Sequence, residues 1–116
     1  MKVAVIGSRG AKPSAAKKIL QALPAETTEI VSGGAVGIDT LARQVAQSLS
    51  LPIREFLPDY AAFGSKAPLV RNREIVAYAD VVLAFWDGES HGTSYTIAEC
   101  IRTGTPVRVI SLKEQR

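Results

Sequence analysis

The sequence alternates short apolar runs with longer segments of helical spacing, and this alternation constrains the fold more than any other feature. The apolar runs are rich in β-branched residues, and most of them lack the polar alternation of a half-exposed strand. Residues 81–86 (Val-Val-Leu-Ala-Phe-Trp) give the strongest strand signal. The predicted strands cover residues 3–6, 29–31, 53–57, 81–86 and 107–110.

Between these strands, apolar residues recur at helical spacing, which predicts four helices. The first begins at Pro13, a residue suited to the first helical position, and ends before Pro24. The third runs from Pro68 to about Tyr78, and the fourth covers residues 95–103 with Gly104 as its stop. The core-facing residues of the first, second and fourth helices are predicted to be Ala15, Ala16, Ile19, Leu20, Leu23; Ile38, Leu41, Ala42, Val45, Leu49; and Ile97, Ala98, Ile101.

The order βαβαβαβαβ predicts an α/β fold, a Rossmann-like open parallel sheet of about five strands with helices on both faces and right-handed crossovers. A chain of 116 residues has the length of one domain, so residues 1–116 are predicted to form a single Rossmann-like domain. Residues 58–67 are predicted to be the longest irregular stretch. Ligands of such folds bind beyond the carboxyl ends of the strands, where the strand order reverses.

Composition excludes several classes of protein. Cys100 is the only cysteine and His91 the only histidine, so neither an internal disulfide nor a Cys/His zinc site is expected, and we predict no metal and no cofactor. No apolar run is long enough for a signal peptide or a membrane span, which predicts a cytoplasmic protein without a membrane partner. The formal net charge of +3 favours acidic partners, but it is small for a dedicated nucleic-acid binder.

Three of the predicted turns that follow strands are rich in glycine and small polar residues. They cover residues 7–10, 32–37 and 87–94, and in a parallel sheet all three lie at one edge. Glycine lets backbone N–H groups approach an anion, and a helix that begins after the turn adds the positive end of its dipole. The turns therefore predict a phosphate pocket. Neither G-x-G-x-x-G nor the Walker motif occurs, which disfavours an ordinary NAD oxidoreductase or ATPase.

Four blocks of sequence resemble the SLOG superfamily, which unites the DprA (Smf) proteins with the Lonely Guy phosphoribohydrolases and single-domain relatives of the YspA/YpsA type. The blocks are Gly-Ser-Arg at 7–9, Ser-Gly-Gly-Ala-Val-Gly-Ile-Asp at 32–39, Arg-Asn-Arg-Glu-Ile at 71–75 and Ser-x-Gly-Thr-x-x-Thr at 90–96. The second block is the most specific and resembles the DprA branch. The resemblance implies a Rossmann-like fold whose pocket binds nucleotides, nucleotide derivatives or, in DprA, single-stranded DNA.

The turns and the resemblance together predict a set of ligand-binding residues from all four blocks. No catalytic residue is assigned. The predicted ligand-binding residues are Gly7, Ser8, Arg9, Ser32, Gly33, Gly34, Gly37, Asp39, Arg71, Asn72, Arg73, Glu74, Ser90, Gly92, Thr93, Ser94 and Thr96.

Some side chains in this set have alternative roles that the sequence leaves open. Arg71 and Arg73 lie about 200° apart on a helix, so only one is expected to face the pocket. Arg71 also stands three residues before Glu74, a spacing typical of a surface ion pair. Asp39 either contacts a ribose hydroxyl or braces its loop, and Asn72 either reads a base or holds a loop.

Three further assignments concern the last polar turn. Thr93 or Ser94 is expected to cap the fourth helix, whose free N–H groups would receive an anion. His91 is more often a surface residue in such a loop than a proton-transfer group. Trp86 and Tyr95 are candidates for stacking on a base, although Trp86 suits the core equally well.

Three functions fit these observations. The first is binding of a small nucleotide or nucleotide-derived ligand. The second is a phosphoribohydrolase that cleaves the N-glycosidic bond of nucleoside monophosphates. Residues 89–96 depart from the Lonely Guy pattern P-G-G-x-G-T-x-x-E, because Thr96 stands where the pattern has its glutamate, and Glu99 lies three residues later. The third is DprA-like binding of single-stranded DNA. A homodimer is a further expectation from the superfamily.

Overall fold

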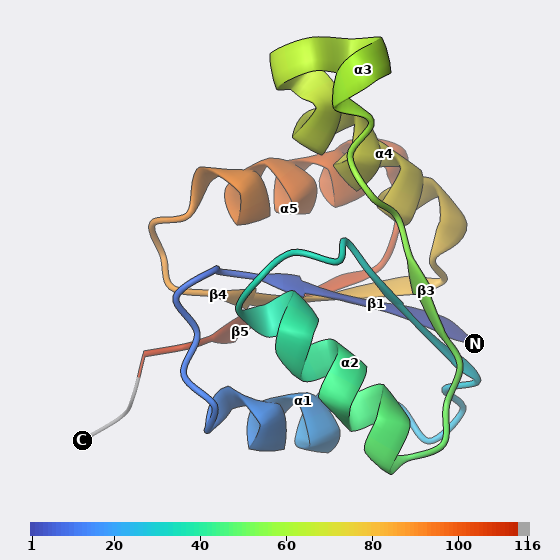
Figure 1. The fold of residues 1–116 in the computed structure, drawn as a ribbon. Coiled ribbons are helices and arrows are strands. Elements are labelled where there is room, and N and C mark those ends of the chain that lie inside the picture. Colours follow the sequence, from blue (N-terminus) through green and yellow to red (C-terminus); the bar gives the residue numbers. More distant parts are fainter. Residues whose placement is uncertain (114–116) are drawn as a thin grey trace.

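A computed structural model of the protein describes residues 1–113, which form a parallel β-sheet between two layers of helices (Figure 1). Strands and helices alternate along the chain, as the apolar pattern predicts. The elements in chain order are β1 (Lys2–Gly7), α1 (Ala15–Ala22), β2 (Glu29–Ser32), α2 (Ile38–Ser48), β3 (Ile53–Glu55), α3 (Tyr60–Phe63), the 3₁₀ turn η1 (Gly64–Lys66), α4 (Ala67–Tyr78), β4 (Val81–Trp86), α5 (His91–Thr103) and β5 (Val107–Ser111).

The five strands have the order β3-β2-β1-β4-β5, and every neighbouring pair is parallel. Ala4 in the central strand β1 is in register with Val31 of β2 on one side and Val82 of β4 on the other. The strand order therefore reverses between β1 and β4, which opens a crevice at their carboxyl ends. The predicted α/β Rossmann-like fold is confirmed.

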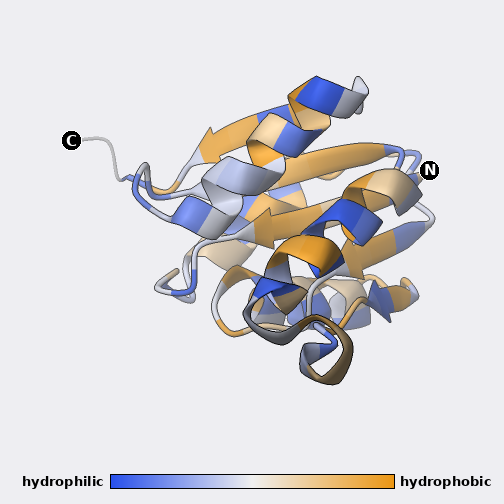
Figure 2. Cartoon of the chain, turned by 90° about the horizontal axis from the view of Figure 1, so that it is seen from above, coloured by the Kyte–Doolittle hydropathy of each residue, from blue (hydrophilic) through white to orange (hydrophobic). Residues whose placement is uncertain are grey.

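The sheet is apolar on both faces because helices cover both. Val3 and Val5 of β1 pack with α1 and α2, whereas Ala4 and Ile6 point to the opposite face, where they pack with α4 and α5. Figure 2 shows the strands as predominantly hydrophobic and the helices with hydrophilic stretches. Successive side chains of a strand point to opposite faces, so a strand with two covered faces needs a continuous apolar run.

The edge strands differ from the prediction. The expected strand over residues 53–57 ends at Glu55, although the Phe56 amide still donates to the Ser32 carbonyl at 2.9 Å. Beyond it Pro58 has no N–H to donate, so pairing stops. The last strand reaches Ser111, one residue beyond the prediction, and Val109 of this edge strand is 51% exposed.

Residues 58–67 are not irregular, contrary to expectation. The Asp59 carboxylate accepts a hydrogen bond from the Ala62 amide at 3.1 Å and caps the short helix α3, which the turn η1 joins to α4. Pro68 lies in the first turn of α4, as its missing N–H favours, and the helix begins one residue earlier than predicted.

The first two helices match the predicted pattern with corrections at their ends. Pro13 lies in the turn before α1 and not at its first position, because the helix begins after Ser14. Leu20 and Leu49 are exposed, although the apolar spacing predicts both on the core face. The residues that do pack into the core, such as Ile19 and Val45, sit nearer the centre of each apolar stripe.

The last helix departs most from the prediction, because α5 begins at His91 and not at residue 95. Its buried face is formed by Thr93, Thr96, Glu99 and Cys100, whereas Ala98 is exposed and Ile101 is 72% exposed. Thr96 fits against the sheet because its hydroxyl donates to the Gly92 carbonyl at 2.9 Å, within the same helix. Gly104 caps the carboxyl end, as expected.

Within residues 1–113, no helix combines the length and the apolar character that a membrane crossing requires.

Candidate functional site

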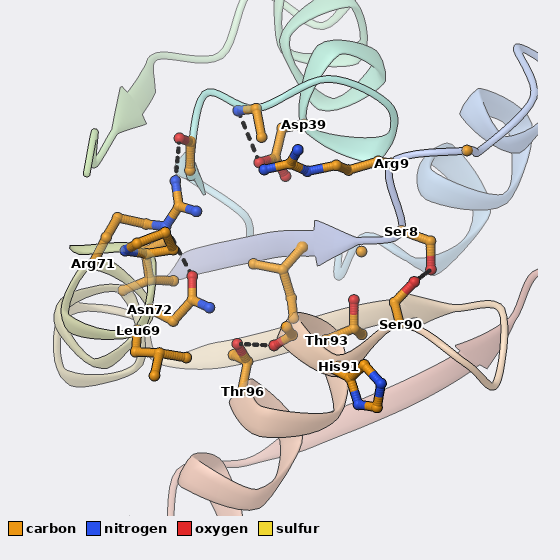
Figure 3. Close-up of a pocket in the computed structure, with 18 residues that line it drawn as sticks. Ser8, Arg9, Asp39, Leu69, Arg71, Asn72, Ser90, His91, Thr93 and Thr96 are labelled. Carbon is orange, nitrogen blue, oxygen red and sulfur yellow. Dashed lines mark hydrogen bonds between the residues drawn. The ribbon is translucent and has the colours of Figure 1, made fainter. Parts of the chain in front are cut away.

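A cavity of about 390 Å³ lies at the carboxyl edge of the sheet, beside the point where the strand order reverses (Figure 3). We call it the central cavity. The turns after β1 and β2, the first half of α4 and the beginning of α5 line it, so the predicted convergence of the glycine-rich turns is present. The predicted site residues that line it are Gly7, Ser8, Arg9, Gly33, Asp39, Arg71, Asn72, Ser90, Gly92, Thr93 and Thr96.

The other predicted site residues lie outside this lining. They are Ser32, Gly34, Gly37, Arg73, Glu74 and Ser94. Gly34 lines a smaller adjoining cavity of about 280 Å³. Arg73 points away from the central cavity, and its Nε donates to the Tyr95 hydroxyl at 2.8 Å. Arg71 is therefore the arginine of this helix that faces the cavity, which settles the alternative left open by the sequence.

Arg71 is 9% exposed and holds the turn after β2 in place. Its Nη1 donates to the Gly33 carbonyl at 2.6 Å and its Nε to the Asn72 side-chain oxygen at 2.8 Å. The ion pair with Glu74, which the spacing left open as an alternative, is not formed. Burial lowers the pKa of Arg71, and the nearby Asp39 carboxylate opposes that shift. The Nη2 atom has no protein acceptor within residues 1–113 and remains available to a ligand.

Asp39 lies in the first turn of α2 and is 8% exposed. One of its carboxylate oxygens accepts a hydrogen bond from the Ala35 amide at 3.0 Å, so the structure contains the loop-bracing bond that the sequence offered as one alternative. Burial raises the pKa of this carboxyl group, while the Ala35 amide and the Arg71 guanidinium act in the opposite direction. Asp39 is the only carboxylate among the described residues that line the central cavity.

Two glycines allow the turn after β1 to approach α2 closely. A Cβ atom at Gly7 would meet the Phe85 carbonyl oxygen and the Ile38 side chain. Gly37, the N-cap of α2, has a φ of 81°, and a Cβ atom there would meet the carbonyl groups of Ser8 and Arg9. These two glycines are explained by packing. Gly92 has open space around its Cα and lines the cavity itself.

A polar network joins the turn after β1 to the turn after β4. The Ser90 hydroxyl lies 3.0 Å from the Ser8 hydroxyl and 3.0 Å from the Asp87 carboxylate, and the Asp87 amide donates to the Ser8 hydroxyl at 3.2 Å. Hydrogen bonds from the backbone amides of Ser90 and Glu89 lower the pKa of Asp87 to about 2. Asp87 is therefore ionised at neutral pH and fixes the turn from which α5 begins.

The amino terminus of α5 opens into the central cavity. Ser90 is the N-cap residue, so the prediction that Thr93 or Ser94 caps this helix is wrong; the Ser94 amide donates to the Ser90 carbonyl at 3.1 Å. The first N–H groups of a helix have no partner inside the helix. Those of His91, Gly92 and Thr93 have no other acceptor in the part of the chain that the structure describes. His91 is exposed, as expected, and also borders the cavity.

The sequence did not reveal the apolar wall of the cavity. Ile6, Pro68, Leu69 and Ile75 contribute to it, and their role as lining depends on how α4 packs over the sheet. Trp86 does not line the cavity; its indole N–H donates to the Ser90 carbonyl at 3.0 Å and braces the turn. Tyr95, the second stacking candidate, contacts Arg73 outside the lining.

Two further observations bear on the chemistry of the site. Glu99, the glutamate nearest to the Lonely Guy position, forms an ion pair with Arg102 at 2.5 Å and is not among the lining residues. Within residues 1–113, there is no group of three or more histidine, cysteine, aspartate or glutamate side chains that could hold a metal ion.

The fold and the site define a Rossmann-like domain whose cavity, at the strand-order switch, combines glycine-rich turns, polar side chains and an apolar wall. Residues 1–53 match the family model of DNA recombination-mediator protein A. Over 84 residues the chain is 38% identical to the gene 61 protein of Mycobacterium phage D29, a match that covers 67% of each chain. The chain belongs to the SLOG superfamily, in its DprA-like part.

Solved structures of DprA proteins are similar over nearly the whole chain. DNA processing protein A from Streptococcus pneumoniae has a TM-score of 0.74 and 25% identity over 93% of this chain and 49% of that chain. The Helicobacter pylori protein, described with a single-stranded DNA binding mode, has a TM-score of 0.65 and 25% identity over 100% and 66% of the two chains. This chain thus spans about half and two thirds of their respective lengths. TM1055, at 23% identity and a TM-score of 0.66 over 91% and 71% of the two chains, shares the fold.

Proposed function

We propose that the central cavity binds a nucleotide or a nucleotide-derived ligand, with a phosphate group at the amino terminus of α5. The observation that carries this proposal is the set of N–H groups of His91, Gly92 and Thr93, which meet an open cavity without a protein acceptor. Helix amino termini favour anions through these N–H groups and through the helix dipole. Arg9 adds a second attraction from the opposite turn, since its side chain extends over the cavity (Figure 3).

The charge of the lining also favours an anion. Two guanidinium groups, those of Arg9 and Arg71, border the cavity with the single carboxylate of Asp39. The positive charge of Arg9 contributes to the lowered pKa of Arg71, so the two guanidinium groups repel one another. A bound phosphate would relieve that repulsion, and the free Nη2 of Arg71 and the guanidinium of Arg9 both suit paired phosphate oxygens.

The wall formed by α4 suits the sugar or base of such a ligand. Pro68 and Leu69 supply apolar surface beside the amide of Asn72. The Asn72 oxygen accepts the bond from Arg71, which leaves the amide N–H groups of Asn72 to point elsewhere. Figure 3 shows this amide nitrogen directed into the cavity. An amide donor at that position would hydrogen-bond to a carbonyl or ring nitrogen of a base.

Isothermal titration calorimetry with AMP, ADP-ribose and cyclic ADP-ribose tests the proposal. At least one of these compounds is expected to release heat with the unmodified protein, and Arg9→Gln is expected to weaken that binding roughly tenfold through the loss of a charge-assisted hydrogen bond. Arg108→Gln, on the exposed part of β5, is the matched control with the same change of charge. Binding that is absent throughout, or that Arg108→Gln weakens as much as Arg9→Gln does, contradicts the proposal.

Single-stranded DNA is the second candidate ligand. It is favoured by the match of residues 1–53 to the DprA family model, because that segment contains the turns after β1 and β2 that line the central cavity. Binding to the DNA backbone must weaken steeply as salt rises. An electrophoretic mobility shift with an oligothymidylate at two salt concentrations tests it; retention that salt does not weaken, or no retention at low salt, removes this candidate.

Release of free base from a nucleotide panel tests the phosphoribohydrolase alternative in the same samples. Glu99 is held by Arg102 outside the lining, and the Asp39 carboxylate accepts a hydrogen bond from the Ala35 amide and braces its own loop. We therefore expect no base release.

A further inference from the structure

A second cavity of about 370 Å³ lies on the other side of the turn after β1, between the start of α1 and the segment that follows β5. It shares only Ser8 and Gly10 with the central cavity, so the two cavities are neighbours separated by this turn. Figure 1 shows the beginning of α1 and the end of β5 at the same edge of the sheet. We call it the lysine cavity, because Lys12, Lys18 and Lys113 line it.

The lysines give this cavity an excess of positive charge. Asp87 is the one carboxylate among its described lining residues, and no lysine of the cavity lies within ion-pair distance of any carboxylate in residues 1–113. Asp87 is already occupied by the backbone amides of Glu89 and Ser90 and by the Ser90 hydroxyl. Three ammonium groups around one committed carboxylate leave a net attraction for an anion.

Two side chains that line the lysine cavity, Lys18 and Ser14, have hydrogen-bond donors to offer a ligand. Lys18 is partly buried, and its ammonium group donates to the Ser111 carbonyl at 3.0 Å, which anchors the charge at the wall and leaves its other N–H groups unused. Ser14, at the N-cap of α1, makes no side-chain bond to the helix, so its hydroxyl is also free to donate to an occupant. A phosphoryl group has the oxygen acceptors that such a set of donors requires.

We propose that the lysine cavity binds a phosphoryl group at a site distinct from the central cavity. The proposal does not depend on the identity of the ligand in the central cavity. The phosphoryl group belongs either to a small phosphorylated compound or to the backbone of a polynucleotide that passes over the turn after β1.

Backbone-amide NMR titration of the full chain with pyrophosphate tests the proposal, because it reports on each cavity separately. The amides of Ala11, Ala15 and Leu112 report on the lysine cavity, and those of Gly92 and Thr93 report on the central cavity. Pyrophosphate is expected to shift the first group of amides with saturation. Shifts confined to Gly92 and Thr93 overturn the proposal and leave the function of the central cavity intact. Shifts confined to Ala11, Ala15 and Leu112 support the proposal and count against a phosphate site in the central cavity.

A triple variant with Lys12→Gln, Lys18→Gln and Lys113→Gln is expected to weaken pyrophosphate binding at the lysine cavity roughly tenfold, since each such charge near the surface contributes about two- to threefold. Lys17→Gln is the matched control, because Lys17 is exposed on the same helix but does not line the cavity. Thermal unfolding of each variant verifies that the fold persists. Equal weakening by Lys17→Gln, or unchanged binding in the triple variant, contradicts the proposal.

A parallel titration with an oligothymidylate distinguishes the two sources of the phosphoryl group. If the oligothymidylate shifts the Ala11 and Ala15 amides and the triple variant abolishes those shifts, the site holds backbone phosphates. If pyrophosphate alone shifts them, the site holds a small phosphorylated compound. If neither does, there is no phosphoryl site in this cavity.

Discussion

Substitution of Gly92 by alanine is expected to stabilise the protein and to weaken ligand binding at the same time. A Cβ atom at Gly92 meets no protein atom within 4 Å, so the fold accepts the methyl group. Gly92 is the second residue of α5, and alanine is the better helix former by about 0.4 to 1 kcal/mol at such a compatible position. A gain of about 0.5 kcal/mol corresponds to a rise in melting temperature of roughly 2 to 4 °C for a domain of this size.

The same methyl group would occupy space beside the free N–H groups at the start of α5, where we place the phosphate. Loss of one hydrogen bond to a charged group costs about 1.5 to 3 kcal/mol, which is roughly a 10- to 150-fold loss of affinity. Thermal unfolding by circular dichroism measures the first effect, and calorimetric titration with the compound that the unmodified protein binds measures the second.

Ser94→Ala is the matched control, since Ser94 lies in the first turn of α5, is exposed, and does not line the cavity. It is expected to leave affinity unchanged. If Gly92→Ala binds as tightly as the unmodified protein while its melting temperature rises, the phosphate does not lie at the amino terminus of α5, and the reasoning is refuted. If its melting temperature falls, the space around Gly92 is not open.

Three further substitutions probe the groups that shape the site. Gly37→Ala is expected to destabilise the protein by roughly 2 to 4 kcal/mol in urea unfolding, because its φ of 81° is strained for alanine and the new Cβ would meet two carbonyl groups; an effect below about 1 kcal/mol would contradict this. Arg71→Lys is expected to cost about 1 to 3 kcal/mol, because lysine cannot bond to Gly33 and Asn72 together, and an unchanged urea midpoint would be inconsistent with that role. The depressed pKa of Asp87 contributes stability that is fully present above the ordinary value of 3.8 and is lost as pH falls toward about 2. In the Asp87→Asn variant, the free energy of unfolding should therefore depend less on pH between about 4 and 2 than in the unmodified protein. The same pH dependence in both proteins would contradict this.

The sheet was predictable from the sequence because its central strands are buried on both faces and carry continuous apolar runs. The position of the turns followed from the same pattern, since glycine and small polar residues end each run. The start of α5 was not predictable in this way. His91 and Gly92 have weak helix propensity, and the helix begins there because Asp87 fixes the preceding turn through the amides of Glu89 and Ser90.

The composition of the cavity was predictable only in part. Spacing alone showed that Arg71 and Arg73 cannot both face the pocket, but the choice between them depends on how α4 rotates against the sheet. Ile75, four residues after Arg71, is buried on the same side and fixes that rotation. Pro68 and Leu69 line the cavity for the same reason, and no local signal in the sequence marks them as part of a site.

The groups around the central cavity divide into those that are committed to the protein and those that remain free. Asp39 and Asp87 accept hydrogen bonds from backbone N–H groups. Arg71 donates through Nε to the Asn72 side chain and through Nη1 to the Gly33 carbonyl. Among the described lining residues, the free donors include the N–H groups at the start of α5, the Nη2 atom of Arg71, the guanidinium of Arg9 and the side-chain N–H groups of Asn72.

Because the committed groups already hold the turns, little ordering remains to be done when a ligand binds, and such preorganisation favours affinity. Changes to Asp39 or Asp87 should therefore lower stability and affinity together, whereas Arg9→Gln should lower affinity alone. Comparing urea unfolding with calorimetric titration across these variants separates the two sets. If Arg9→Gln destabilises the fold as much as Asp87→Asn does, Arg9 belongs with the groups that brace the turns. The N–H groups of α5 would then bind the phosphate without help from Arg9.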